Sequence, residues 1–238
     1  MRMRSTQKMA ALAVGALVLT IGASPASAAE SPEPLVTIAP EDEQASRAFM
    51  TEFGVAADVQ DALLDKARHG QSLLADSETA DPVSVTEFTR DASDFEVATF
   101  EDGSISVVER EIPVVVPEGT FQPRAVTGCT VGGGPTYTTY NNCKVHYRTP
   151  IFSYGFYTSF TMTGSSATIS TANQMFHEYS VGHLRDSWNL TVARKTGNAA
   201  NPAHVQMRVT YTLYPGVGQI NKGVRIFADG LKYWQQSY

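Results

Sequence analysis

Alternating apolar and polar residues dominate the second half of the chain. Between Phe152 and Met162 large apolar side chains recur at every second position, with Thr158 as the exception, and Val205 to Leu213 repeats the pattern. A period of two places such side chains on one face of a β-strand. Both stretches therefore predict long strands that turn one face toward a hydrophobic core.

Shorter β-prone runs surround these two strands and are separated by Gly, Asn and Pro. They cover residues 143–149, 167–171, 174–181, 188–194, 217–226 and 231–236. Seven or eight strands with turn residues between them are typical of antiparallel sandwiches. We therefore predict a mainly β protein whose C-terminal part is an antiparallel β-sandwich or jelly roll.

A helical pattern precedes the strands. Acidic residues 41–43 fit a first helical turn, where the helix dipole favours negative charge, and an apolar stripe follows before Gly54. A second helix is predicted from Ala57 to His69, with Gly70 as its stop signal. The two helices would form an αα-hairpin with a thin apolar seam.

Three strands are predicted after this hairpin, over residues 85–90, 95–100 and 105–109. Asp102-Gly103 lies between the last two, and Asp-Gly between β-prone runs predicts a type I′ turn. Residues 29–120 are therefore predicted to form a small α+β unit.

The N-terminus has the form of a secretory signal peptide. Arg2, Arg4 and Lys8 frame a basic start, a short apolar run follows, and Ala26-Ser27-Ala28 fits a cleavage site. No later stretch approaches the ~20 apolar residues that span a bilayer. We expect residues 1–28 to be removed and the protein to be secreted into the extracellular space.

Charge divides the chain that remains. Residues 30–125 contain 21 Asp and Glu against 6 Lys and Arg, whereas residues 126–238 contain 3 against 9. All Tyr and Trp lie beyond residue 136. We predict an acidic leader or pro-segment (29–120), a linker (121–128) and a basic β-sandwich domain (129–238). The leader could cover the basic domain and be removed after export, near Arg124.

Cys129 and Cys143 are the only cysteines. An oxidising compartment favours a disulfide between them. Closing this short loop would contribute ~3 kcal/mol to stability. Two cysteines alone cannot make a zinc site.

Catalytic chemistry is restricted by the few acids of the basic part, which are Glu178, Asp186 and Asp229. His177, Glu178 and His183 are the candidates for a secreted hydrolase, either a nuclease or a glycosidase. The two histidines would share a strand face, and a zinc site would need His146 or His204 as a further ligand. We expect neither a metal nor another cofactor.

A binding function fits the excess of basic residues in the C-terminal part better than catalysis does. Lys144, His146 and Arg148 lie on one face of a predicted strand, and Arg208 lies on the polar face of another. If the strands are neighbours, these residues form a cationic patch for an anionic cell-wall polymer or polysaccharide, and nucleic acid is not excluded. We predict a non-catalytic extracellular binding module; the alternatives are the hydrolase and a secreted toxin or inhibitor.

Four short motifs carry a family resemblance. They are Phe53-Gly54-Val55, Glu101-Asp102-Gly103-Ser104, Val126-Thr127-Gly128-Cys129 and Asn142-Cys143-Lys144. With them the chain resembles a group of secreted proteins of actinobacteria without a known activity. The resemblance implies export and a two-part layout, and it supplies no catalytic residues.

Overall fold

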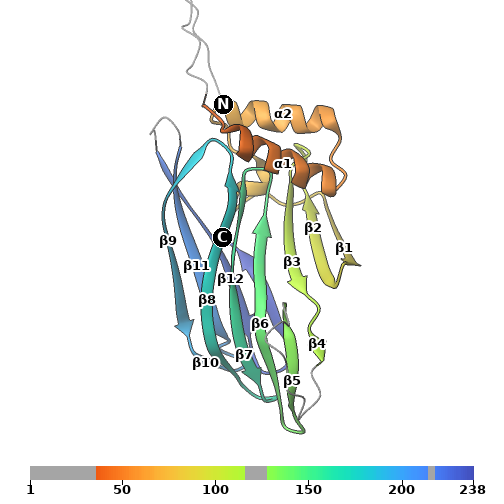
Figure 1. Cartoon of the computed structure of the whole chain (residues 1–238), viewed down its shortest axis with the longest axis vertical. Helices are drawn as coiled ribbons and strands as arrows, with labels where there is room; N and C mark the ends of the chain where they lie inside the picture. The colour runs from red at the N-terminus through yellow and green to blue at the C-terminus, as the bar shows by residue number, and fades with distance from the viewer. Residues whose placement is uncertain (1–35, 116–127, 214–217) are drawn as a thin grey trace, which may run out of the picture. The chain divides into compact units, whose positions relative to one another are not determined.

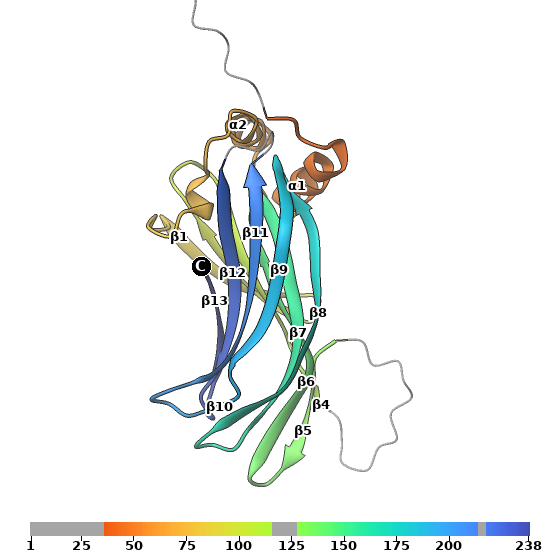
Figure 2. The ribbon, with the colours of Figure 1, turned by 90° about the vertical axis from the view of Figure 1, so that its left-hand side faces the viewer.

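Two β-sheets face each other, and two helices lie across one end of the pair (Figures 1 and 2). The computed structural model describes residues 36–115, 128–213 and 218–238, and residues 33–238 form one compact unit. The expected signal peptide and the expected cleavage near Arg124 lie outside the described residues. No helix among the described residues is long and apolar enough to cross a bilayer.

The predicted αα-hairpin is confirmed. Helix α1 spans Pro40–Glu52 and helix α2 spans Ala57–Arg68. Proline at the start of α1 suits a position whose N–H has no helical partner, and the three acids of its first turn face the positive end of the dipole. Phe49 and Leu63, one from each helix, are buried in the hydrophobic core that the sheets also share. A short 3₁₀ helix, η1 (Leu74–Asp76), follows.

Sheet A contains nine strands and runs in the order β1-β2-β3-β6-β7-β8-β10, with β4 and β5 attached to the side. Its strands are β1 (Ser84–Arg90), β2 (Ser93–Thr99), β3 (Ile105–Glu111), β4 (Val114–Val115), β5 (Thr130–Gly134), β6 (Tyr137–Arg148), β7 (Phe152–Met162), β8 (Ala167–Ser180) and β10 (Thr196–Gly197). All pairs are antiparallel except the short pair of β4 with β5.

Sheet B contains four antiparallel strands in the order β13-β12-β11-β9. They are β9 (His183–Arg194), β11 (Ala203–Leu213), β12 (Gln219–Ala228) and β13 (Tyr233–Ser237). Its inner face includes the predicted apolar positions of β11, among which Val205, Met207 and Val209 are fully buried. The predicted core face of β7 is likewise buried. The protein is therefore mainly β and sandwich-like, as its sequence pattern predicts.

The change of charge along the sequence does not coincide with a break in the sheet. Strand β3 of the acidic part pairs with β6 of the basic part, with Glu109 opposite His146 and Val107 opposite Arg148. Both parts also contribute to one cluster of buried apolar side chains. The expected acidic leader and the expected basic domain thus share a sheet and a core.

Cys129 and Cys143 form the predicted disulfide. The glycine-rich segment between them forms β5 and pairs with the start of β6. Gly133 adopts φ of 150°, and a Cβ at this position would meet the Tyr137 carbonyl oxygen at 2.3 Å. A side chain would therefore disrupt the tight hairpin.

The predicted type I′ turn at Asp102-Gly103 is wrong. A type I′ turn needs positive φ at both central residues, and in this segment only Gly103 has it. Gly103 N–H donates to the Phe100 carbonyl, and Phe100 N–H donates to the Ser104 carbonyl, as in a type I turn followed by a left-handed residue. Positive φ at both positions occurs instead at Asp91 and Ala92, which join β1 to β2.

Replacing Ala92 by glycine is expected to stabilise the protein. Ala92 has φ of 60°, and the left-handed region costs an L-residue with a Cβ about 1 kcal/mol relative to glycine. We expect Ala92→Gly to raise the free energy of unfolding by up to ~1 kcal/mol in urea denaturation. Ala80→Gly, at a position without positive φ, is the control; an equal gain there would contradict the explanation.

Candidate functional site

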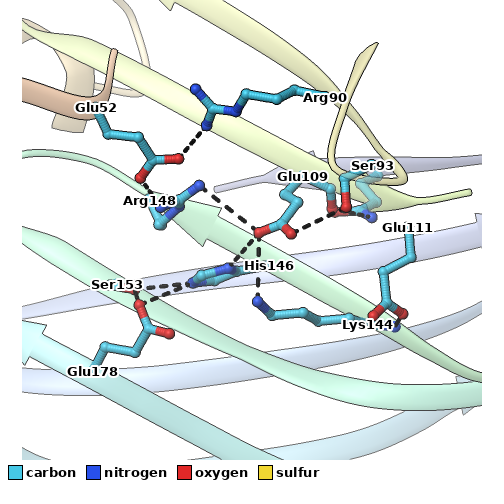
Figure 3. A network of polar contacts seen from close by, with 11 residues as sticks. Glu52, Arg90, Ser93, Glu109, Glu111, Lys144, His146, Arg148, Ser153 and Glu178 are labelled. Carbon is cyan, nitrogen blue, oxygen red and sulfur yellow. Dashed lines mark hydrogen bonds and ion pairs between the residues drawn. The ribbon is translucent and has the colours of Figure 1, made fainter. Parts of the chain in front are cut away.

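A network of charged and polar side chains, called here the His146 network, crosses the outer face of sheet A from helix α1 to strand β8 (Figure 3). His146 of β6 is at its centre and is 1% exposed. Its Nδ1 lies 3.0 Å from Glu109 Oε2 on β3, and its Nε2 lies 2.9 Å from Ser153 Oγ on β7. The Ser153 hydroxyl in turn donates to Glu178 Oε2 on β8, at 2.6 Å. Four neighbouring strands each supply one member.

Further cations converge on Glu109. Lys144 Nζ lies 3.4 Å and Arg148 Nη2 lies 3.8 Å from its Oε2. Burial alone would raise the pKa of Glu109, but the hydrogen bond with His146 and the charges of Lys144, His146 and Arg148 outweigh it and lower the pKa to about 2. The carboxylate is therefore ionised at any pH near neutrality.

Glu178 has a similarly low pKa. The hydrogen bond with His146 is the main cause; burial opposes it, while the hydrogen bond from Ser153 and the charges of His146 and Lys144 add to it, and the pKa is lowered to about 2. Both carboxylates are acceptors only. His146 therefore links two carboxylates across its ring, Glu109 directly and Glu178 through the Ser153 hydroxyl.

The contacts Glu109–His146–Ser153 follow the order of a serine hydrolase triad, but the protonation differs. A nucleophilic serine gives its proton to the histidine Nε2, whereas the Ser153 proton points to Glu178. Ser153 is also 0% exposed, so no substrate can reach its oxygen. The chemistry that the arrangement supports is ion pairing between strands, not nucleophilic attack.

Carboxylates from the acidic part of the chain form ion pairs and hydrogen bonds with the predicted binding residues of β6. Glu52 of α1 accepts hydrogen bonds from Arg148, at 3.0 Å, and from Arg90 of β1. Glu111 accepts the backbone N–H of Lys144 at 2.8 Å. His146 and Arg148 are therefore not a free cationic surface. The predicted patch is also not continuous, because β6 belongs to sheet A and Arg208, on β11, to sheet B.

The three hydrolase candidates do not converge. Tyr154 pairs with His177 while Ser153 pairs with Tyr179, so Glu178 is the extra residue of a β-bulge. His177 and His183 do not share a strand, because β8 ends at Ser180 and β9 begins at His183, although both rings pack near Tyr211. His177 packs against Tyr211 between the sheets, with ring centroids 5.9 Å apart, whereas Glu178 joins the outer network.

The two histidines of this trio are in apolar surroundings. Burial and the charge of Arg185 lower the pKa of His177 to about 4, and its Nε2 is buried without a partner among the described residues. Burial also lowers the pKa of His183, whose Nδ1 lies 2.7 Å from the Val181 carbonyl oxygen. His204, considered as a further zinc ligand, lies on a different sheet from His177 and at the opposite end of β11 from Leu213, the cross-strand partner of His183. Within residues 36–115, 128–213 and 218–238, no group of three or more His, Cys, Asp or Glu side chains is placed to hold a metal.

Arg208 lies on a second polar surface, the outer face of sheet B. We define this surface by the cross-strand rows that share its side of the sheet, which are Trp234-Phe227-His204, Gln236-Arg225-Gln206-Thr191 and Gly223-Arg208-Asn189. The inner neighbours of these residues are the buried apolar positions of β11 and β12. The surface thus combines amide and guanidinium groups with one aromatic row.

The aromatic row is stacked. Phe227 and Trp234 have ring centroids 5.3 Å apart and planes at 12°, and His204 stacks on the other side of Phe227 at 5.1 Å. Arg225 lies 3.7 Å above the Tyr238 ring. The row is not predicted from the sequence, because His204, Phe227 and Trp234 lie on three different strands and meet only through the pairing of sheet B.

Comparison with known proteins adds little to this description. No protein-family model matches the chain, and no curated protein sequence matches it. A solved structure of the hypothetical protein lmo2686 from Listeria monocytogenes EGD-e is similar over 61% of this chain and 94% of that chain, with 12% identity and a TM-score of 0.34.

Proposed function

We propose that this chain is a secreted, non-catalytic binding module and that the outer face of sheet B binds an anionic polysaccharide of the cell wall. The observation that carries the proposal is the set of unpaired arginines on that face. Arg208 and Arg225 take part in no ion pair with any residue that the structure describes. By contrast, Lys144 and Arg148 of sheet A are held by carboxylates.

The charge balance of sheet B supports an anionic ligand. Its four strands contain five basic residues and one acid, Asp186. Thr212 and Gln219 hydrogen bond to Asp186 at one end of the sheet, so its charge is partly satisfied there. A surface with unpaired guanidinium groups attracts anions, and the planar guanidinium can bind a carboxylate or phosphate with two parallel hydrogen bonds.

The other groups on this face suit a sugar polymer. Gln, Asn and Thr side chains both donate and accept hydrogen bonds, as sugar hydroxyls do. The stacked row of His204, Phe227 and Trp234 offers aromatic surface beside them, where the apolar face of a sugar ring can pack. The disulfide is consistent with folding in an oxidising compartment.

Arg208→Gln/Arg225→Gln is expected to weaken retention on purified actinobacterial cell walls. Each lost arginine removes a charged contact, worth roughly 1 kcal/mol in a surface setting, so the double variant should elute at clearly lower NaCl concentration than the wild type. The measurement is a salt-gradient elution of the mature chain from immobilised walls.

The matched control is Arg110→Gln/Arg185→Gln, which changes the net charge equally outside the defined rows. Equal loss in this control would mean that net charge alone drives retention, and salt-independent retention of the wild type would eliminate the ionic contact. Tighter binding to double-stranded DNA than to walls at the same salt concentration would assign the face to nucleic acid instead.

A further inference from the structure

We infer that a cleft beside β13 binds one ring of a neutral sugar through two adjacent hydroxyl groups. The cleft has a volume of about 390 Å³, within the range of small-molecule sites. Strands from both sheets and the segment after η1 line it. Its charged residues are Asp76, Glu78 and Lys222, and three serines, Ser77, Ser106 and Ser237, add hydroxyl groups beside those of the lining tyrosines. None of them belongs to the His146 network.

The walls of the cleft are aromatic. Phe100, Tyr147 and Tyr154 line it, and all three are nearly or fully buried. The Tyr147 hydroxyl is 3.3 Å from the Ala75 carbonyl oxygen, and the Tyr154 hydroxyl is 3.4 Å from that of Gly223. With their hydroxyls held by the backbone, the two tyrosine rings are fixed in place. Tyr154 is 0% exposed and only supports the wall, whereas Phe100 and Tyr147, each 7% exposed, present the apolar surface that suits the C–H face of a sugar ring.

Asp76 supplies an acceptor that the fold leaves unused. Thr149 donates to its Oδ1 at 2.9 Å, whereas its Oδ2 is buried and has no hydrogen-bond partner among the described residues. Burial raises the pKa of Asp76 to about 6, with the nearby charge of Asp102 acting in the same direction and Lys222 and Thr149 against it. The terminal torsion of a carboxylate is soft, so a small rotation would turn Oδ2 toward a donor in the cleft.

Lys222 supplies a donor beside this acceptor. Its ammonium group donates to the Asp76 backbone carbonyl, which leaves two of its three N–H groups for other acceptors. It forms no ion pair with a residue in the described part of the chain. A carboxylate and an ammonium group thus line the same cleft with unused hydrogen-bonding capacity.

A neutral molecule with adjacent hydroxyls matches both groups. One hydroxyl donates to Asp76, and its neighbour accepts from Lys222, because a hydroxyl can do either. An anion would be repelled by Asp76 and an exposed Glu78, and a cation by Lys222. The pyranose ring of a hexose carries such hydroxyl pairs and an apolar face, so it fits the charged groups and the aromatic wall together.

This inference does not depend on the proposed wall binding, although the two surfaces meet. Gln236 lines the cleft and also belongs to the outer face of sheet B. A sugar polymer that lies on that face could therefore place one unit in the cleft.

The test is an NMR titration of the mature, isotope-labelled chain with glucose, galactose, mannose and N-acetylglucosamine, with cyclohexanol as a ring that has a single hydroxyl. We expect saturable shifts of the Ser77, Ser106 and Lys222 amides with at least one sugar and none with cyclohexanol. Lys222→Met should weaken that binding at least about tenfold, the loss expected for one charged hydrogen bond. Lys195→Met, which removes an exposed lysine elsewhere, should leave it unchanged.

Saturable shifts with none of the four sugars, equal shifts with cyclohexanol, or wild-type affinity in Lys222→Met would overturn the inference. If Lys222→Met changes the spectrum outside the cleft, Asp76→Asn provides the same comparison from the other side of the ligand. Failure of the wall-binding proposal is separate, because Arg208→Gln/Arg225→Gln should keep the sugar shifts, while Lys222→Met should keep salt-sensitive retention on walls.

Discussion

Residues 128–238, produced without the preceding chain, are expected not to fold. The segment 36–115 supplies the strand that pairs with β6 and part of the shared core, including Phe49 and Leu63. It also supplies Glu109, the partner of the buried His146. Losing several buried side chains at about 1.5–3 kcal/mol each exceeds the usual net stability of a domain.

Circular dichroism and thermal unfolding of the purified fragment would test this expectation. We expect no cooperative transition for the fragment alone and a recovered transition when residues 29–115 are co-expressed as a separate chain. The fragment contains both cysteines, so a missing disulfide would not explain its failure. A monomeric fragment with a cooperative transition of its own would contradict the expectation and would support a removable leader.

Glu109→Gln is expected to destabilise the protein by on the order of 3 kcal/mol at neutral pH. The substitution keeps the size of the side chain but removes the charge that faces His146, Lys144 and Arg148. Of these, His146 is almost fully buried, so solvent cannot replace the lost partner. Urea denaturation would measure the change. Glu101→Gln, an exposed glutamate in the β2–β3 turn, should stay within about 0.5 kcal/mol of the wild type.

The same substitution should change the response to acid. The pKa of Glu109 is lowered from 4.5 to about 2 in the folded protein, so its contribution to stability is complete above the unfolded value and is lost as the pH falls from about 5 to 2. The wild type should therefore lose stability over this window, and Glu109→Gln should show a shallower decline. Parallel curves for the two proteins would mean that Glu109 is not an ion-pair partner in solution.

Local patterns in the sequence predict the elements better than their arrangement. The strands β7 and β11 and the two helices follow from patterns of residues close together in the chain. The disulfide follows because each cysteine has only one possible partner. The pairing of β3 with β6 joins residues 107–110 to residues 145–148. Nothing in the sequence of either stretch identifies the other as its pairing partner. The shared sheet therefore cannot be predicted from composition or from the alternation of apolar residues.

The candidate sites illustrate the same limit. Glu109, Ser153 and Glu178 each look like an isolated outward polar residue on its own strand, and they form a network only because four strands bring them side by side. His177, Glu178 and His183 are close in the sequence, but His177 faces the interior, Glu178 faces the outer network and His183 begins the next strand. Arg208 is exposed, but its cross-strand partners are Gly223 and Asn189, and it lies on a different sheet from Arg148.

In the folded protein, the acidic part of the sequence and the unpaired arginines of the basic part lie on different sides of the molecule. Strands β1 to β3, with their many acids, extend sheet A, whereas the unpaired arginines face outward from sheet B. The folded molecule therefore carries an electric dipole across the sandwich. If the proposed binding to an anionic cell wall holds, the field of that wall exerts a torque on the dipole and turns sheet B toward the wall before any contact forms. Orientation on approach, and not only affinity after contact, is then a property that the charge pattern sets.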